Sequence, residues 1–320
     1  MNLTVVPLLN VKQELMGSML VLENITMEKR IKSTMARYMT KEVVEKLLES
    51  GADTLGGQLQ MASILFSDIR NFTSLSERMG ARETVLLLNE YFTRMVDVVF
   101  KYNGVLDKFI GDGIMAVFGA PFSSGEDADH AVKTGVDMMR VLVEYNKQRI
   151  QQSNSVIDIG IGISTDEVVS GNIGSLQRMD YTVIGDGVNL ASRLESANKL
   201  YKTNILISEL TFNQLKNNYI FREIDIIRVK GKSKPVGVYE ILDFHDETSF
   251  PHLHEVLELY HAGLLAYRKR AWKESIRHFK EALHLNAFDK VSQLYLQRCE
   301  YYLCTPPEED WDGVWVMESK

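Results

Sequence analysis

The chain has 320 residues, a length that suggests one large domain with appendages, or two domains. Of these residues, 45% are hydrophobic and 25% charged, as in an ordinary globular protein. Its net charge of −7 argues against a surface that binds nucleic acid, so any polyanion site must be local. No apolar run approaches the roughly 18 residues of a membrane span, and without a basic segment followed by an apolar one we expect no signal peptide. With only Cys299 and Cys304, a disulfide framework is excluded. We therefore expect a cytoplasmic protein.

The first segment, LTVVPLLNVKQELMGSMLVLENIT, predicts two strands around a turn at Gly17. Two strands do not form a stable domain alone. Residues 1–25 resemble the closing hairpin of a PAS-type sensor module, which implies that the upstream sensor domain is missing from the chain. The alternative is a plain hairpin that docks on the main domain.

Residues 26–50 are charged and helix-prone, with apolar residues at helical spacing. This pattern predicts a signalling helix that pairs with its copy in a dimer, or else an amphipathic helix that lies on its own domain. Gly51, Gly56 and Gly57 mark a linker.

Between residues 51 and 244 short apolar strands alternate with helices, in the order strand, helix, hairpin, helix, strand. This order predicts the α+β class and a ferredoxin-like βαββαβ sandwich with extra strands and helices.

Residues 245–320 predict a helical tail with an extended end pinned by Trp311 and Trp315. Counted from Gly263, the positions of Ser275, Phe279 and Ala282 resemble a tetratricopeptide repeat. One repeat cannot form a groove, because such arrays need about three units. A helical pair that packs on the main domain is therefore favoured over a peptide receptor.

The tetrapeptide IGDG occurs twice, and its acid has a different setting each time. Asp112 lies at a turn between two apolar strands, and Asp68 ends the apolar run ILFSD, where an unpaired carboxylate would be costly to bury. Together they predict an oxygen-ligated site for a divalent cation. After Asp68 a loop enters a helix at Phe72 and Thr73, where free N–H groups would suit a triphosphate.

The second acid, Asp186, precedes an apolar stripe of helical spacing and is predicted to be a structural N-cap. On the opposite face of the same helix, Asn189 and Arg193 are one turn apart and project together. They are either ordinary surface residues, or a hydrogen-bond donor and a fixed cation that act on a reacting phosphate.

Four segments, in order, resemble the sequence blocks of class III nucleotide cyclases: ILFSDIRNFTSLSE, VLDKFIGDGIMAVFGAP, RMDYTVIGDGVNLASRLES and VKGKSKPVGVYEI. The resemblance implies a cyclase palm-like fold and a signalling enzyme that makes a cyclic nucleotide and pyrophosphate. It also implies a homodimer with active sites at the interface.

The resemblance implies that Asp68, Asp112 and the carbonyl of Ile69 bind two Mg²⁺ ions, for which Mn²⁺ can substitute. One ion would activate the ribose 3′-hydroxyl and the other would hold the triphosphate. By the same resemblance, Asn189 orients the ribose and Arg193 stabilises charge on the α-phosphate.

The distal phosphates would be bound by Arg178 and Lys230. Lys108 and Thr182 fall at the positions that read the purine: a lysine donates to adenine, whereas guanylate-forming relatives carry a glutamate there. Thr182 departs from the more familiar aspartate and places the chain in a lysine–threonine subgroup. The resemblance therefore implies ATP as the substrate.

Three alternatives remain from the sequence. A regulatory nucleotide-binding module would have lost an aspartate, and both are present. A palm-fold polymerase or diguanylate cyclase would carry a GGDEF-like hairpin, and the tip here reads IGDG. The third alternative is a guanylate cyclase, which an assay comparing ATP with GTP would distinguish from an adenylate cyclase.

Overall fold

The computed structural model describes residues 2–10, 13, 15–23, 57–175, 178–227, 235–308 and 311. The chain forms two compact units, residues 1–54 and residues 55–320. The first contains an antiparallel hairpin of β1 (Asn2–Leu9) and β2 (Leu15–Glu23). The predicted turn at Gly17 is wrong: Gly17 pairs with Leu8 inside the hairpin, and the chain turns earlier, where Gln13 N–H donates to the Asn10 carbonyl at 2.9 Å. The helix predicted over 26–50 lies outside the described residues.

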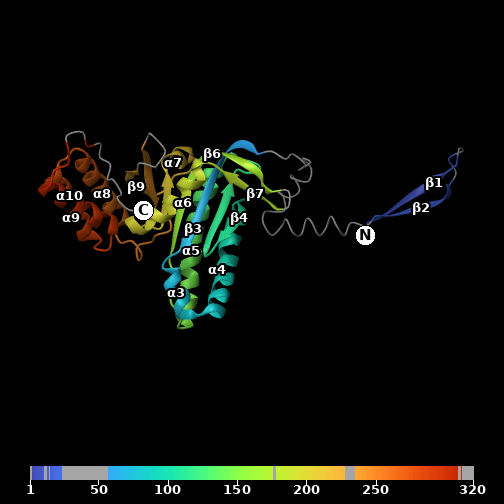
Figure 1. Ribbon diagram of the computed structural model, residues 1–320, viewed down its shortest axis with the longest axis horizontal. Helices are drawn as coiled ribbons and strands as arrows, with labels where there is room; N and C mark the ends of the chain where they lie inside the picture. The colour runs from blue at the N-terminus through green and yellow to red at the C-terminus, as the bar shows by residue number, and fades with distance from the viewer. Residues whose placement is uncertain are drawn as a thin grey trace. The chain divides into compact units, whose positions relative to one another are not determined.

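The second unit is built on an eight-stranded sheet (Figure 1). Its strands run in the order β4-β5-β3-β6-β8-β10-β9, and β7 pairs with β6 off this path. All neighbours are antiparallel except β6 and β8, which are parallel. The strand bounds are β3 (Gln58–Ile69), β4 (Val105–Ile110), β5 (Gly113–Phe118), β6 (Ile159–Ser175), β7 (Arg178–Ile184), β8 (Ile205–Ser208), β9 (Phe221–Ile227) and β10 (Val236–Ile241).

Helices cover both faces of this sheet. They are α3 (Phe72–Met79), α4 (Ala81–Lys101), α5 (Asp127–Gln151), α6 (Asp186–Tyr201) and the short α7 (Glu209–Gln214). The start of β6 shows why α5 and α6 lie on opposite faces. Successive side chains of a strand alternate between the two faces, and isoleucines alternate with glycines here. Ile163 lies next to Gly135 of α5, whereas Gly162 lies against the backbone of α6 at Ala191.

The main core lies between the sheet and the long helices α4 and α5, which run side by side (Figure 1). Tyr91, Met95 and Val99 of α4 are fully buried there, together with Ile161 and Ile163 of β6. The chain order β3, α4, β4, β5, α5, β6 is the predicted βαββαβ order. The predicted α+β fold with extra strands and helices and a C-terminal helical extension is therefore confirmed.

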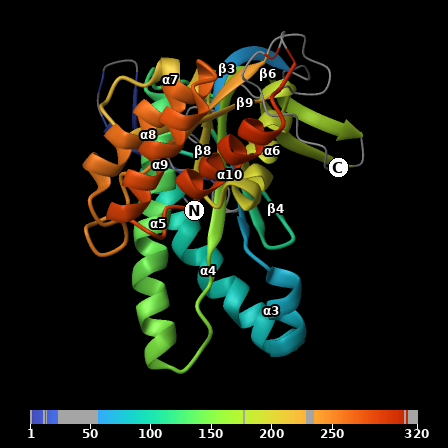
Figure 2. The same cartoon turned by 90° about the vertical axis from the view of Figure 1, so that its left-hand side faces the viewer.

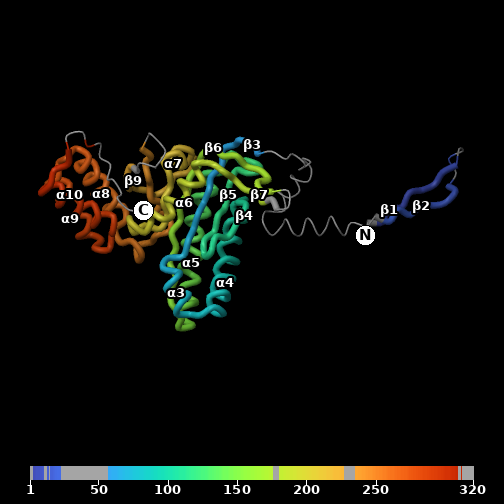
Figure 3. The backbone as a smooth tube through the Cα atoms, in the orientation of Figure 1, coloured from blue at the N-terminus to red at the C-terminus, as the bar shows by residue number. Residues whose placement is uncertain are grey.

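The tail consists of three helices, α8 (Leu253–Arg268), α9 (Trp272–Leu285) and α10 (Lys290–Cys304), rather than the predicted pair. Figures 2 and 3 show them grouped next to β9. Ser275, Phe279 and Ala282 are all buried, and the Phe279 ring leaves no room for a side chain at Gly263. The likeness to a tetratricopeptide repeat stays a prediction.

Buried ion pairs fix the tail to β9, which is the edge strand of the sheet. Arg222 of β9 bonds Asp289 at 2.8 Å and Glu240 of β10 at 2.6 Å. Arg298 of α10 bonds Asp225 of β9 at 2.8 Å. Each of these side chains is at most 5% exposed. Loss of one partner would leave the other charge buried and unpaired, which is costly. These pairs therefore hold the helices in a defined position.

Within the described residues no helix is both long and apolar enough to cross a membrane. Both cysteines are free, with Cys299 buried and Cys304 exposed. Trp311 packs against Tyr267 and Tyr302, each at 5.3 Å between ring centroids, as expected for a pinned C-terminal segment. Trp315 lies outside the described residues.

Candidate active site

Two carboxylates meet at one end of β3. Asp68 lies next to the last residue of that strand, and Asp112 lies in the turn between β4 and β5. The backbone N–H of Ile69 donates to Asp112 Oδ2 at 3.1 Å and holds the turn against β3. Gly111 has a φ of 64°, in the left-handed region that favours glycine. A side chain at Gly113 would lie 3.0 Å from the carbonyl oxygen of Ser67. Glycines on both sides of Asp112 thus allow its close approach to Asp68.

The nearby Asp68 makes ionisation of Asp112 less favourable. Burial, a hydrogen bond to Asp68 and the charge of Asp68 together raise the pKa of Asp112 to about 6. Two carboxylates held this closely fit a divalent cation, which would offset their repulsion. Among the described residues no group of three or more His, Cys, Asp or Glu side chains forms a complete protein cage. A cation here would draw its other ligands from water and substrate phosphates, as Mg²⁺ commonly does.

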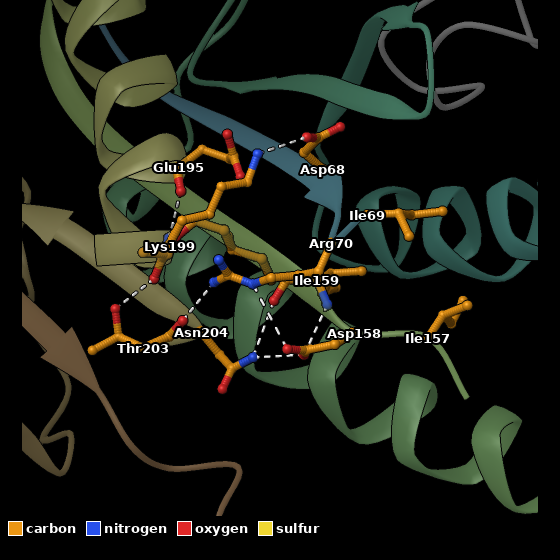
Figure 4. A network of polar contacts seen from close by, with 12 residues as sticks. Asp68, Ile69, Arg70, Ile157, Asp158, Ile159, Glu195, Lys199, Thr203 and Asn204 are labelled. Carbon is orange, nitrogen blue, oxygen red and sulfur yellow. Dashed lines mark hydrogen bonds and ion pairs between the residues drawn. The ribbon is translucent and has the colours of Figure 1, made fainter. Parts of the chain in front are cut away.

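A lysine ammonium already faces Asp68 (Figure 4). Lys199 of α6 places its Nζ 3.6 Å from Asp68 Oδ2. One turn earlier, the buried Glu195 is 7% exposed, and its Oε1 has no hydrogen-bond partner within the described residues. Burial and the charge of Asp68 raise the pKa of Glu195. The negative charge of Asp68 favours a cation beside it, and within this chain the Lys199 ammonium is that cation.

Arg70 secures this end of β3 to the far end of α6 (Figure 4). Its Nη2 donates to the Thr203 carbonyl at 2.6 Å, and its Nε lies 3.7 Å from Asp158 Oδ2. Asn204 donates to the same Asp158 at 2.8 Å. A cleft of about 510 Å³ opens beside this network. Its lining includes the cations Arg70, Arg78, Lys199 and Lys202.

Asn189 and Arg193 lie on the same helix as Lys199 but nearer its N-terminus. At 1.5 Å per residue they are about 15 Å and about 9 Å from Lys199 along the axis. Arg193 is also rotated by about 120° from Lys199, whereas Glu195 is rotated by only about 40°. Both predicted residues are exposed, and neither has a hydrogen-bond or ion-pair partner among the described residues. The face of α6 that meets Asp68 in this chain is thus the Glu195–Lys199 face.

The predicted purine-reading pair converges on a third residue, Asp107. Thr182 of β7 donates from its hydroxyl to Asp107 Oδ2 at 3.0 Å, across 75 positions of sequence. The Lys108 ammonium lies 3.3 Å from the same oxygen. Asp107 is a buried side chain, 3% exposed, and burial raises its pKa. The structure therefore brings Lys108 and Thr182 together around a carboxylate that was not predicted from the sequence, and their role in reading the purine stays a prediction.

The loop after Asp68 enters α3 as predicted. Phe72 and Thr73 are the first residues of α3, and the first backbone bond of the helix runs from Leu75 N–H to the Asn71 carbonyl. The N–H groups of Phe72 and Thr73 thus precede the first intrahelical bond, in the position expected for an anion site. Arg178 begins β7. Lys230 lies outside the described residues, so its approach to Arg178 stays a prediction.

The second IGDG differs from its prediction. Helix α6 begins at Asp186, and the N-cap is Gly185, one residue earlier than predicted. Gly185 has an extended φ of 167°. Because glycine has no side chain, the helix begins without a side-chain cap. Asp186 lies in the first turn, where the helix dipole favours negative charge. Its predicted structural position at the helix start is retained, but its role as N-cap is wrong.

Comparisons with known proteins agree with this geometry. A family model described as the adenylate and guanylate cyclase catalytic domain matches residues 57–242. The "Adenylate cyclase, terminal-differentiation specific" of Dictyostelium discoideum is 33% identical over 276 residues, which cover 84% of this chain and 13% of that protein. The chain thus spans a small part of that relative's length.

Two solved structures are also similar. The adenylyl cyclase CyaB from P. aeruginosa is 40% identical, with a TM-score of 0.55, over 59% of this chain and 97% of that chain. The guanylyl cyclase Cya2 is 41% identical, with a TM-score of 0.53, over 58% of this chain and 94% of that chain. Because the family model matches more than half of the chain, from the residue before β3 to the residue after β10, this protein belongs to the class III adenylate and guanylate cyclase family.

Proposed function

We propose that this protein is an adenylate cyclase, which converts ATP to 3′,5′-cyclic AMP and pyrophosphate. The ribose 3′-oxygen attacks the α-phosphorus, a new P–O bond closes the ring, and the bond to pyrophosphate breaks. The observation that carries the proposal is the pairing of Asp68 with Asp112 at the end of β3. With two Mg²⁺ or Mn²⁺ ions bound, that pair would supply activation of the 3′-hydroxyl and neutralisation of the triphosphate.

The chain's other residues position the nucleotide and stabilise charge. Phe72 and Thr73 would donate backbone N–H groups to the triphosphate from the start of α3, and Arg178 with Lys230 would bind its distal end. Asn189 would orient the ribose. Arg193, a permanently charged donor, would stabilise the α-phosphate as pyrophosphate leaves. Little covalent chemistry is required of the protein.

The choice of ATP over GTP is supported by Lys108 and Thr182. The two residues lie on separate strands, and because both contact Asp107 their side chains are close enough to act on one base. A site that hydrogen-bonds one base edge disfavours the other base, because buried polar groups are then left unpaired. Guanylate cyclase activity is the second candidate, favoured by the 41% identity to Cya2.

The purified chain with Mn²⁺ and either ATP or GTP distinguishes these candidates, with the product identified by chromatography. We expect cyclic AMP from ATP and poor turnover of GTP. Equal turnover of the two nucleotides would contradict the choice of base. Absence of any cyclic product from either nucleotide would favour a regulatory nucleotide-binding module instead.

The active site is proposed to be shared between two copies of the chain. Lys199 and Glu195, rather than Asn189 or Arg193, meet Asp68 within one chain. Asn189 and Arg193 are exposed and so are accessible to a second copy. A homodimer would bring the acids of one copy to the Asn/Arg pair of the other, and its two-fold symmetry would create two equivalent sites.

A further inference from the structure

We propose that Asp107 is a specificity-determining residue: its carboxylate fixes the Thr182 hydroxyl as a hydrogen-bond acceptor toward the base, and so selects adenine over guanine. The inference rests on the proposed cyclase function and assigns part of its base choice to a residue beyond Lys108 and Thr182. It starts from the two contacts that converge on Asp107 Oδ2, at 3.0 Å from Thr182 and 3.3 Å from Lys108.

A local irregularity of β4 makes this arrangement possible. In a regular strand, neighbouring side chains point to opposite faces, so Asp107 and Lys108 would diverge. The pairing of β4 with β5 shifts between Leu106 and Lys108, which leaves Asp107 as an extra residue without a partner in the register. Such a bulge redirects a side chain. Here it allows the Asp107 carboxylate to reach both the adjacent Lys108 and Thr182 on β7.

The chemistry of a hydroxyl turns this contact into selectivity. An ionised carboxylate only accepts hydrogen bonds, so the single hydroxyl proton of Thr182 is committed to Asp107. The oxygen of Thr182 can then offer only its lone pairs to a ligand. Adenine presents an amine donor at its 6-position, whereas guanine presents a carbonyl acceptor there. Adenine would be paired, and guanine would place one acceptor against another.

Asp107 also orients the other member of the pair. Lys108 is 42% exposed, and a mobile ammonium could point into water. The charge of Asp107 holds it on the side of Thr182, where it can donate to an acceptor on the adenine edge. One buried carboxylate thus sets both the polarity of the hydroxyl and the position of the cation.

The test is the ratio of kcat/KM for ATP to kcat/KM for GTP, measured in Asp107→Asn. The amide can donate to Thr182, which releases the hydroxyl proton toward a guanine carbonyl. We expect the ratio to fall by roughly tenfold or more, mainly through better use of GTP. In a Thr182→Val background, Asp107→Asn should lower the ratio less than it does in the wild type, because the hydroxyl is gone and only the effect on Lys108 remains. Asp107→Ser provides a second variant should Asp107→Asn fold poorly.

Asp180→Asn is the matched control. Asp180 is an exposed acid on β7 whose charge acts on Asp107, and it has no hydrogen bond to Thr182 within the described residues. We expect this variant to keep the wild-type ratio. An equal loss with both nucleotides in Asp107→Asn, with the ratio unchanged, would reduce Asp107 to a structural role and overturn the inference alone. A wild-type chain without preference for ATP would overturn both this inference and the proposed function.

Discussion

The two IGDG acids show how much the surroundings of a residue decide its chemistry. Asp112 lies beside Asp68 in the β4–β5 turn, with its pKa raised to about 6 by burial and by that neighbour. Asp186 has the same neighbours in sequence but lies in the first turn of α6. There the helix dipole favours its charge. The first acid is suited to binding a cation, and the second to stabilising a helix start.

The raised pKa of Asp112 predicts how pH and metal interact. A folded-state pKa of about 6, above the ordinary value of 3.8, means that the folded state binds this proton more tightly than the unfolded state. Without metal, the contribution of Asp112 to stability is therefore full below the ordinary pKa and is lost as the pH rises through about 6. A divalent cation would reverse this loss, because it binds the ionised form.

We therefore expect Mn²⁺ to raise the melting temperature more at roughly pH 7.5 than at roughly pH 5, where protons compete for the carboxylate. Thermal unfolding with and without Mn²⁺ measures both shifts. Asp112→Asn should show little Mn²⁺ stabilisation at either pH and should lose cyclase activity. Equal Mn²⁺ shifts for wild type at the two pH values would contradict the assignment of this acid as a ligand.

Some residues of the site could be predicted because they are charged residues in an otherwise apolar or glycine-rich stretch of sequence. Asp68 ends an apolar run, and glycines flank Asp112. Asp107 was missed, although a charged pair inside the apolar strand VLDKFI was a signal, because only the bulge turns its side chain toward Thr182. Lys199 was missed because its contact with Asp68 depends on where α6 crosses the sheet. No local pattern specifies that crossing.

At the scale of elements, the alternation of isoleucine and glycine on β6 positions α6. Gly162 faces α6, and an added Cβ there would overlap the Ala191 carbonyl oxygen and the Glu195 nitrogen, which are backbone atoms and cannot rotate away. Gly135 of α5 lies on the other face of the same strand. A Cβ on Gly135 would lie 3.5 Å from Ile163 Cδ1, an ordinary contact.

We therefore expect substitution by alanine to have opposite effects on stability at these two glycines. Gly162→Ala should lower the free energy of unfolding by about 1–3 kcal/mol or more, since α6 must move. It should also reduce activity, because α6 carries Asn189 and Arg193. Gly135→Ala should be neutral or stabilise by up to about 1 kcal/mol, since alanine favours a helix interior. Urea unfolding of both variants provides the comparison, and a stable, fully active Gly162→Ala variant would refute the close packing of α6.

The order of the principal elements was predicted, but some extensions were not. The pattern IDIGIGIS predicted only the buried start of β6, which continues through polar residues to Ser175 and pairs with β7. A strand segment that is exposed on one side carries little hydrophobic pattern. The short helix α7 was missed for a similar reason, since six residues hold too few turns for a periodic signal.

At the scale of the whole molecule, the tail and the cyclase sheet form one structure through the pairs Arg222–Asp289 and Arg298–Asp225. Tyr295 adds a 2.6 Å bond to the Ile224 carbonyl. These contacts cover the edge strand β9, which would otherwise offer unpaired backbone groups to other chains. The proposed dimer would therefore form through other surfaces, and the exposed Asn189 and Arg193 of α6 lie on one of them.

The proposal of a shared active site predicts complementation between two inactive variants. Asp68→Ala removes an acid, and Asn189→Ala removes the ribose-orienting residue that the partner is proposed to supply. Each homodimer should be inactive. In a mixed dimer, one site collects both lesions and the other collects neither. Random equimolar mixing should restore roughly a quarter of wild-type activity, because half of the dimers are mixed and each has one intact site of two.

The measurement is cyclic AMP formation after the two variants exchange subunits, with exchange verified by pull-down of one tagged chain with the other. Gly135→Ala mixed with Asp68→Ala serves as the matched control. Random mixing leaves a quarter of its dimers with two intact acid sites and half with one, so about half of wild-type activity is expected. A site contained in one chain would give no rescue for the Asp68→Ala and Asn189→Ala mixture at any ratio. Rescue near a quarter requires Asp68 of one chain to act with Asn189 of another, because no other combination of these two chains holds both residues intact.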